Sequence, residues 1–111
     1  MNINGFARGL MAKNDSEEKF LKHVASLVER QLKEWDEQYE VMVMKLTHYE
    51  FVVNHNDHFY HLQLTIHDIH KLQQKSPYAL DRKIWKELEK QGLTIKRDKG
   101  NYIAVMFDKS L

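Results

Sequence analysis

Apolar residues recur every three or four positions in the first third of the chain. They are Phe20, Val24, Leu27, Val28, Leu32, Trp35 and Tyr39. This spacing predicts an amphipathic helix over roughly residues 15–39, with charged side chains on the opposite face. Asn14, Asp15 and Ser16 all offer N-cap oxygens, and Asp15 and Glu18 have the spacing of a capping box, with Asp in place of the usual Ser or Thr. Such a helix is about 36 Å long, so its end is a candidate seam for a homodimer.

The period then shortens to two. Residues 41–53 and 58–66 are rich in β-branched and aromatic side chains, and residues 54–57 (Asn-His-Asn-Asp) are a strong turn signal between them. The pattern predicts an antiparallel β-hairpin. Its buried face should hold Tyr49, Phe51, Val53, Tyr60, Leu62, Leu64 and Ile66. Its open face should hold His48, Glu50, His61, Gln63 and Thr65.

After Thr65 the period lengthens again, which predicts two helices. The first should end near Gln74, and the second should restart at Ser76 and Pro77, with Ser as N-cap and Pro as the first helical residue. The inward positions are Ile66, Ile69 and Leu72 in the first helix and Leu80, Ile84 and Leu88 in the second. Gly92 is placed to cap the second helix. Residues 93–97 and 102–107, with a turn at 98–101, predict a second hairpin.

Several features of residues 65–107 match one known arrangement. A Thr opens a short helix with the pair Asp68-Ile69, Ser76 closes the turn, and a basic, glycine-bearing hairpin follows the second helix. In these features the segment resembles the winged helix-turn-helix domain of bacterial transcription regulators. The resemblance implies that the second helix reads double-stranded DNA and that the hairpin, as the wing, contacts phosphate groups.

The charge distribution is compatible with that function. Residues 1–64 carry a formal charge of −3 and residues 65–111 carry +4, within a net charge of +1. A basic half attracts polyanions through counterion release. The alternative interpretation is a solvated lysine-rich surface with ion pairs such as Glu87 with Lys83 or Lys90.

The candidate DNA-contacting residues follow from the helical geometry and from the resemblance. At 100° per residue Arg82 and Lys86 lie almost opposite the inward stripe. We expect Tyr78, Arg82, Lys83 and Lys86 to face the groove. The resemblance to the wing implies phosphate contacts from Lys96, Arg97 and Lys99.

Length and composition limit the remaining possibilities. A chain of 111 residues and 13.3 kDa suits one domain. We expect a flexible segment at 1–13 and a single α+β domain at 14–111, built from a long N-terminal helix, a hairpin, a helix-turn-helix pair and a C-terminal hairpin. Cysteine is absent, which excludes disulfides, a thiol nucleophile and thiolate metal sites. No catalytic or cofactor motif occurs, so we expect a non-enzymatic protein without a cofactor.

Histidine is concentrated in the middle of the chain, with six of seven between residues 48 and 70. His48 and His61 are placed to meet Glu50 on one sheet face, but the spacing matches no dedicated metal motif, so we predict no metal site. The N-terminal residues lack the apolar run of a signal peptide, and no run is long enough to span a membrane, so we expect a cytoplasmic protein. The leading function is a small DNA-binding regulator. The alternative is an adaptor that grips a protein partner with its first helix or sheet edge, without binding nucleic acid.

Overall fold

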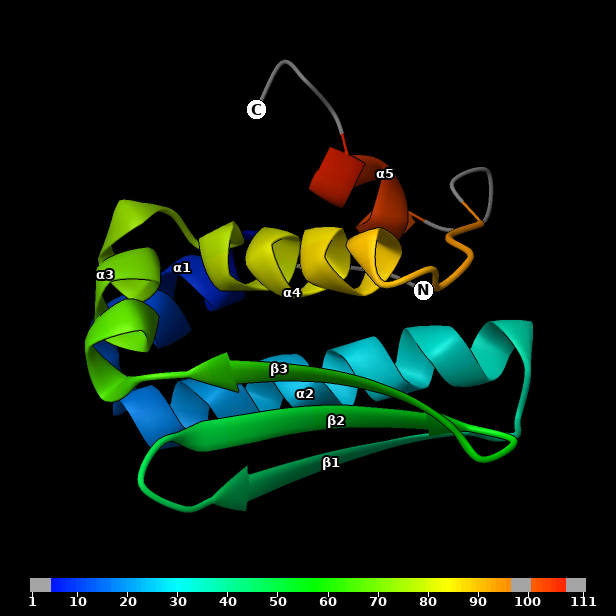
Figure 1. The fold of residues 1–111 in the computed structure, drawn as a ribbon. Coiled ribbons are helices and arrows are strands. Elements are labelled where there is room, and N and C mark those ends of the chain that lie inside the picture. Colours follow the sequence, from blue (N-terminus) through cyan, green and yellow to red (C-terminus); the bar gives the residue numbers. More distant parts are fainter. Residues whose placement is uncertain (1–4, 97–100, 108–111) are drawn as a thin grey trace.

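The structure, a computed structural model, describes residues 5–96 and 101–107 of the chain. Helices and strands follow in the order α1 (Gly5–Asn14), α2 (Glu17–Trp35), β1 (Tyr39–Lys45), β2 (Tyr49–His55), β3 (His58–Leu64), α3 (Ile66–Lys75), α4 (Ala79–Lys90) and α5 (Asn101–Phe107). The three strands form one layer, and the helices lie on one side of it (Figure 1). The mixed α and β composition agrees with the α+β prediction.

The sheet is an antiparallel meander in the order β1-β2-β3. The register of β2 and β3 pairs Phe51 with Leu62, which confirms the predicted hairpin. Its tight turn places Asn56 and Asp57 at positive φ, 51° and 66°, the backbone conformation that a type I′ turn requires. The face toward the helices buries the aromatic and aliphatic residues expected there, except Ile66, which begins α3 and is exposed.

The prediction of one strand over residues 41–53 is wrong. The chain turns back after Lys45, where the N–H of Leu46 donates to the carbonyl of His48 at 2.9 Å, and β1 becomes a third strand beside β2. The strand-like pattern of residues 41–45 continues on the other side of the turn, in β2. Periodicity alone therefore does not reveal the turn. The turn allows Val41 and Val43 to pack against the same core as β2.

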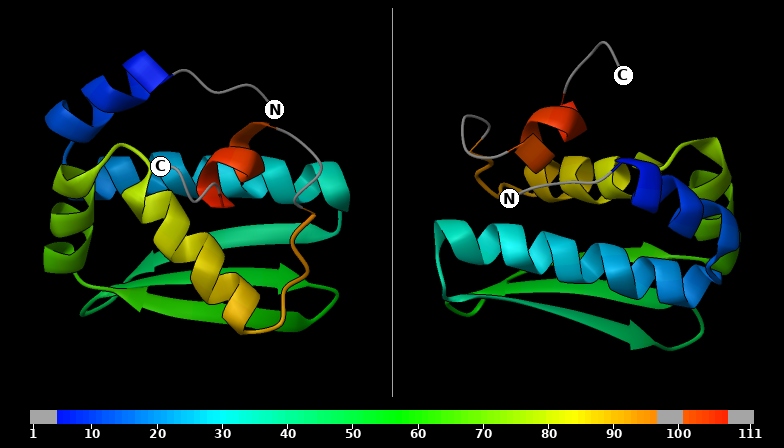
Figure 2. Two further views of the ribbon diagram at one scale, coloured as in Figure 1. Left: turned by 90° about the horizontal axis from the view of Figure 1, so that it is seen from above. Right: turned by 180° about the vertical axis from the view of Figure 1, so that it is seen from behind.

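Helix α2 packs against the β1 side of the sheet, and α4 crosses the β3 side (Figure 2). The helix predicted over residues 15–39 corresponds to α2 but ends at Trp35, because Tyr39 already belongs to β1 and is buried there. Of the three N-cap candidates, the cap is Ser16, whose hydroxyl accepts from the N–H of Lys19 at 3.2 Å.

Two helices occupy segments for which the sequence predicted no helix. Residues 5–14 form α1, whose Met11 and Ala12 pack against the core. Residues 101–107 form α5 where a return strand was predicted, and residues 93–96 form no strand. The predicted C-terminal hairpin is therefore wrong in its described parts, and its turn at 97–100 lies outside them. In α5 a helical face buries Tyr102, Ile103 and Met106 against α4, and a short apolar run fits a helix as well as a strand.

A buried ion pair connects the two added helices to α4. Arg8 of α1 is 3% exposed and Asp81 of α4 is fully buried. The guanidinium donates to both carboxylate oxygens, at 2.5 and 2.8 Å, and to the carbonyl of Pro77 at 3.0 Å. The hydroxyl of Tyr102 in α5 donates to the same carboxylate. Burial and the nearby Asp81 raise the pKa of Tyr102 well above its ordinary value, so this hydroxyl remains a donor.

Replacement of Arg8 by Met should strongly destabilise the fold, because it leaves the Asp81 carboxylate buried without its cation. We expect a loss of about 3–5 kcal/mol in the free energy of unfolding, measured by urea denaturation. The double variant Arg8→Met with Asp81→Leu should recover much of this loss. The control Arg30→Met, at an exposed arginine of α2, should change stability by less than about 0.5 kcal/mol. Equal losses of stability in Arg8→Met and Arg30→Met would contradict a structural role for the pair of Arg8 and Asp81.

Candidate nucleic-acid interface

Helices α3 and α4 are consecutive and joined by a short turn, as predicted. A capping box fixes the start of α3: the Thr65 hydroxyl accepts from the N–H of Asp68 at 2.9 Å, and the Asp68 carboxylate accepts from the N–H of Thr65 at 3.2 Å. Hydrogen bonds from the backbone and the side chain of Thr65 to its carboxylate lower the pKa of Asp68. Helix α4 begins at Ala79, two residues later than predicted, because Ser76 and Pro77 form a turn in which the Ala79 N–H donates to the Ser76 carbonyl.

The exposed stripe of α4 consists mainly of lysines. Lys83, Lys86 and Lys90 are exposed at positions i, i+3 and i+7, which lie on one side of a helix. Glu87 lies among them and pairs with Lys90 at 4.0 Å. The opposite side holds Ile84, Trp85 and Leu88, all fully buried in the core. The inward stripe predicted for this helix is confirmed, and one of the expected surface ion pairs is present as well.

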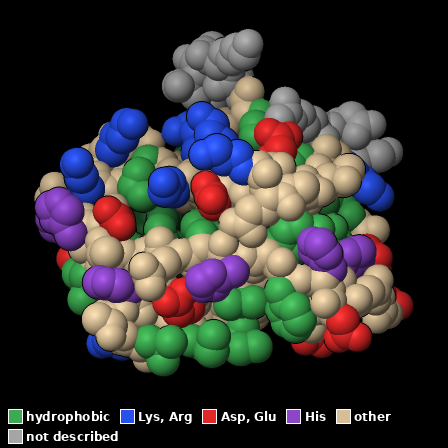
Figure 3. All heavy atoms as spheres, viewed as in Figure 1, with side chains coloured by type: hydrophobic (Ala, Val, Ile, Leu, Met, Phe, Trp, Pro, Cys, Tyr) green, Lys and Arg blue, Asp and Glu red, His purple; other side chains and the backbone are tan. Residues whose placement is uncertain are grey.

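Helix α3 adds two further lysines, Lys71 and Lys75, both exposed and one helical turn apart. Lysine and arginine side chains gather over α3 and α4 on the upper part of the molecule, with acidic side chains between them (Figure 3). We call the five residues Lys71, Lys75, Lys83, Lys86 and Lys90 the lysine face. Among the side chains of α3 and α4 that are not buried, the acidic ones are Asp68, Glu87 and Glu89, so the excess charge of the lysine face is positive.

Two of the four residues expected in the groove have other surroundings. Tyr78 is half-buried, and its ring centroid lies 4.8 Å from the guanidinium carbon of Arg8. This contact stacks Tyr78 on the buried ion pair. Arg82 is also half-buried, and its Nε is enclosed without a hydrogen-bond partner among the described residues. Lys83 and Lys86, in contrast, are exposed as expected.

Little of the predicted wing lies within the described chain. Lys96 is exposed at the end of the non-strand segment 93–96, while Arg97 and Lys99 lie outside the described residues. Instead of a hairpin beside α4, helix α5 packs on it, and the ring centroids of Trp85 and Tyr102 are 6.2 Å apart. Helix α5 covers the Trp85 side of α4 and leaves the lysine stripe uncovered.

Several histidines form pairs with carboxylates. His61 contacts Glu50 on the open sheet face, His55 lies 2.8 Å from Asp36, and His70 lies 3.1 Å from Glu17. Hydrogen bonds from Gln63 and His61 lower the pKa of Glu50. Each contact joins one imidazole to one carboxylate. Across residues 5–96 and 101–107, no group of three or more His, Asp or Glu side chains is arranged to hold a metal ion.

Side chains from helices and loops occupy both edges of the sheet. On the β1 edge, the carboxylate of Glu29 in α2 accepts from the N–H of Val41 at 2.8 Å. On the β3 edge, Gln91 uses both ends of its amide: it accepts from the N–H of His61 at 2.9 Å and donates to the carbonyl of His61 at 2.6 Å. An added strand must first displace these side chains, so the structure disfavours the edge-pairing mode of an adaptor.

Comparison with known proteins gives this chain no relatives: no family model, no curated protein and no solved structure matches it. In the part of the chain that the structure describes, no helix combines the length and apolarity needed to cross a membrane. The function of this chain is therefore inferred from its own surfaces.

The sequence predicts DNA contacts for Lys83 and Lys86 but not for the other three lysines of the lysine face. Lys90 follows Lys83 and Lys86 on the same side of α4 by helical spacing, whereas Lys71 and Lys75 belong to α3 and join them because α3 and α4 pack together. The available signal was the basic excess over residues 69–99, which hold nine Lys or Arg against four Asp or Glu. The edge contacts of Glu29 and Gln91 had no sequence signal, because each joins segments distant in the chain.

Removal of the Gln91 amide should expose a strand edge. For Gln91→Ala we expect self-association at high protein concentration, because the N–H and carbonyl of His61 become free for pairing with a second chain. The monomer should lose about 1 kcal/mol of stability. Light scattering after size exclusion measures the association. The control Gln38→Ala, at an exposed glutamine of the turn before β1, should remain monomeric. Association of both variants alike would contradict the edge-capping role.

Replacement of Gln63 by Ala should raise the pKa of Glu50 toward its ordinary value, because the largest cause of its lowered pKa is the hydrogen bond from Gln63. A carboxyl group whose pKa is lower in the folded state than in the unfolded state stabilises the fold at pH values above its unfolded pKa. That contribution is lost as the pH falls through the lowered value. Carbon-detected NMR titration of the glutamate carboxyls measures the change. An unaltered titration of Glu50 in Gln63→Ala would refute this assignment.

Proposed function

We propose that the protein binds double-stranded DNA through the lysine face, as a small non-enzymatic DNA-binding protein of the helix-turn-helix type. The observation that supports this most directly is the exposure of five lysines on two consecutive helices. Lysine ammonium groups neutralise phosphate groups and release condensed counterions, which is a large part of the affinity of proteins for duplexes. The short turn between α3 and α4 and the exposed stripe of α4 fit a helix that approaches a groove.

The composition of the stripe favours contacts to the DNA backbone. Lysine is a point charge on a flexible stem, whereas bidentate reading of base edges relies mainly on Arg, Asn and Gln. On α4 the residue of that kind is Arg82, which is half-buried. We therefore propose that phosphate contacts dominate binding, with Arg82 supplying the base contact of a sequence-specific regulator. Lys96, the described residue of the predicted wing, lines a hollow with Asp36, Tyr39 and His55, so it is not counted in the lysine face.

A second candidate function is supported by the open face of the sheet. Four large apolar side chains are exposed there or at the adjoining turn: Met42, Met44, Leu46 and Phe59. Exposed apolar residues grouped on one face are typical of protein-binding surfaces. An adaptor of this kind would bind its partner with the sheet face, since side chains already occupy the sheet edges.

The test is the salt dependence of binding to a mixed-sequence duplex of about 20 base pairs, followed by fluorescence anisotropy. Five phosphate contacts give a slope of log K against log salt of about −4 to −5. The variant Lys83→Gln, Lys86→Gln, Lys90→Gln should reduce this slope by about three and weaken binding. The matched control Lys19→Gln, Lys22→Gln, Lys33→Gln removes three exposed lysines of α2 and should behave more like the wild type.

Two results would reject the proposal. One is the absence of salt-dependent binding by the wild type. The other is an equal loss in the α4 variant and the α2 control, which would show attraction to overall charge instead of to the lysine face. Either result would favour the adaptor.

A further inference from the structure

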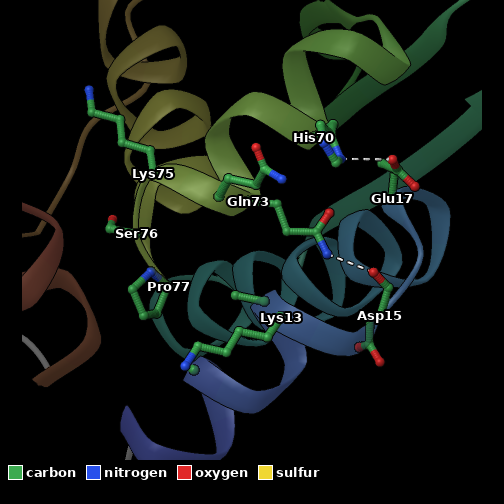
Figure 4. A pocket seen from close by; sticks show the side chains of 11 residues that line it. Lys13, Asp15, Glu17, His70, Gln73, Lys75, Ser76 and Pro77 are labelled. Atoms are coloured by element: carbon green, nitrogen blue, oxygen red, sulfur yellow. Dashed lines mark hydrogen bonds and ion pairs between the residues drawn. The ribbon is translucent and has the colours of Figure 1, made fainter.

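A cavity of about 630 Å³ lies between α1, the start of α2, the C-terminal half of α3 and the turn before α4 (Figure 4). Two of its polar side chains are engaged within the protein. The amide of Gln73 donates to the main-chain carbonyl of Asp15 at 2.7 Å, and His70 pairs with Glu17 at 3.1 Å. These contacts indicate that the two side chains hold α3 against the start of α2. Exposed apolar side chains gather elsewhere, on the open face of the sheet.

The strand register arranges this open face as three rows of three side chains. The helices cover the other side of the sheet (Figure 1). Each row runs from β1 through β2 to β3, and the rows are Met44, Glu50 and Gln63; Met42, Val52 and His61; and Glu40, Asn54 and Phe59. Met44 and Phe59 therefore lie at opposite corners, with Val52 at the centre.

Apolar side chains run diagonally across the three rows. Met42 is 51% exposed, Met44 is 39% exposed and Phe59 is 61% exposed, and Val52 between them is half-buried. A further corner is polar, because the carboxylate of Glu50 accepts from the amide of Gln63 at 2.9 Å and contacts His61. Apolar side chains grouped on one face are typical of surfaces that bind protein.

The pattern of the open face is complementary to itself. A two-fold axis that lies in the plane of the face and passes from Val52 toward Gln63 exchanges Met44 with Phe59 and Glu50 with His61. In two copies related by this axis, Met44 lies opposite the partner's Phe59. Glu50 lies opposite the partner's His61, whose imidazole can donate to a carboxylate. The strands of the two copies then cross at nearly a right angle, which is one of the two usual ways in which sheets pack face to face.

The other two-fold arrangements fit this face less well. An axis along the strands sets Glu50 against the same residue of the second copy, so that like charges meet. An axis across the strands sets Met44 against the partner's Glu40. An axis along the diagonal from Met44 to Phe59 sets Glu50 against the partner's Met42. In each case a carboxylate loses water without gaining a hydrogen-bond donor or a cation, which is unfavourable.

We propose that the open face of the sheet is the contact surface of a reversible homodimer, in which Met44 packs on the partner's Phe59 and Glu50 accepts from the partner's His61. The occupant of the face is a second copy of this chain instead of the different protein that an adaptor would bind. Helix α2 lies on the other side of the sheet, so this interface is distinct from the helical seam predicted from sequence. The lysine face belongs to α3 and α4, which leaves the proposal independent of DNA binding.

The size of the face predicts a weak dimer. Three strands of seven residues make a face of roughly 23 by 14 Å, from a rise of about 3.3 Å per residue and a strand spacing of about 4.8 Å. Such a face buries less than the about 800 Å² per partner of a standard interface. We therefore expect a dissociation constant of about 0.1–1 mM, so a sample diluted during size exclusion is monomeric.

The first experiment is sedimentation equilibrium of the full-length protein between about 10 µM and about 1 mM. We expect one monomer–dimer equilibrium with a dissociation constant in the stated range. The variant Phe6→Glu with Leu10→Lys, at two exposed apolar positions of α1, is the matched control and should dimerise like the wild type. A wild type that is monomeric at about 1 mM would overturn the proposal, as would an equal loss of dimer in the α1 control and in the sheet variants described next.

The second experiment tests which residues meet across the interface. Met44→Lys and Phe59→Glu should each weaken dimerisation at least about tenfold, because each sets a charge against an apolar side chain of the partner. The double variant Met44→Lys with Phe59→Glu should recover to within about threefold of the wild type, because each introduced ammonium then faces a carboxylate of the partner. The two positions are at opposite corners of one sheet, so the new charges do not pair within a chain.

The matched comparison is Met42→Lys with Phe59→Glu. It introduces the same two charges, but Met42 lies opposite the partner's Asn54 in this arrangement, so the dimer should remain at least about tenfold weaker than the wild type. Failure of the first double variant to recover, or equal recovery of both double variants, would refute the proposed interface. Thermal unfolding of dilute samples shows that each variant is folded, since all three positions are exposed.

Discussion

The buried contact between Arg8 and Asp81 is the interaction on which the arrangement of the outer helices depends. A carboxylate without solvent is stable only if charge and hydrogen bonds compensate its lost hydration. Arg8 supplies both, and Tyr102 adds a further hydrogen bond. The three residues belong to α1, α4 and α5. The compensation of the buried Asp81 carboxylate therefore brings together helices from both ends of the described chain. Tyr78, stacked on Arg8, extends this cluster to the turn before α4.

The cluster also determines which sides of α4 remain available. The sheet and α2 cover one side, and α5 covers the side that carries Trp85. What remains uncovered is the stripe of Lys83, Lys86 and Lys90, next to the lysines of α3. The surface proposed for DNA is therefore the side of α4 that the sheet, α2 and α5 do not cover. The packing of α4 against these elements fixes the positions of its lysines.

The sequence predicted the parts of the fold that depend on local periodicity. Helix α2, the β2–β3 hairpin and the α3–α4 pair follow from apolar spacing and turn residues, and the structure has each of them. It did not predict α5, because seven residues of mixed apolar character fit either period and only packing against Trp85 decides between them. The sequence also did not predict that Asp81 is buried. Its burial depends on Arg8, 73 positions earlier, and no local pattern indicates such a pairing.

Of the residues proposed for DNA contact from sequence, those whose exposure follows from helical phase, Lys83 and Lys86, are exposed in the structure. Tyr78 is half-buried and in contact with Arg8 of α1, a neighbour that helical phase alone does not reveal, and Arg82 is half-buried as well. The cavity beside Gln73 was equally inaccessible to sequence reasoning, since its walls come from four separate segments.

The separation of 73 positions between Arg8 and Asp81 also bears on how the chain reaches this state. Joining distant residues costs loop-closure entropy before any contact compensates it, and chains rich in such contacts fold slowly. The β-meander and α2 are neighbours in the chain and close short loops. We therefore expect them to assemble first, and the docking of the N-terminal helix onto Asp81 to be a late step on the folding pathway.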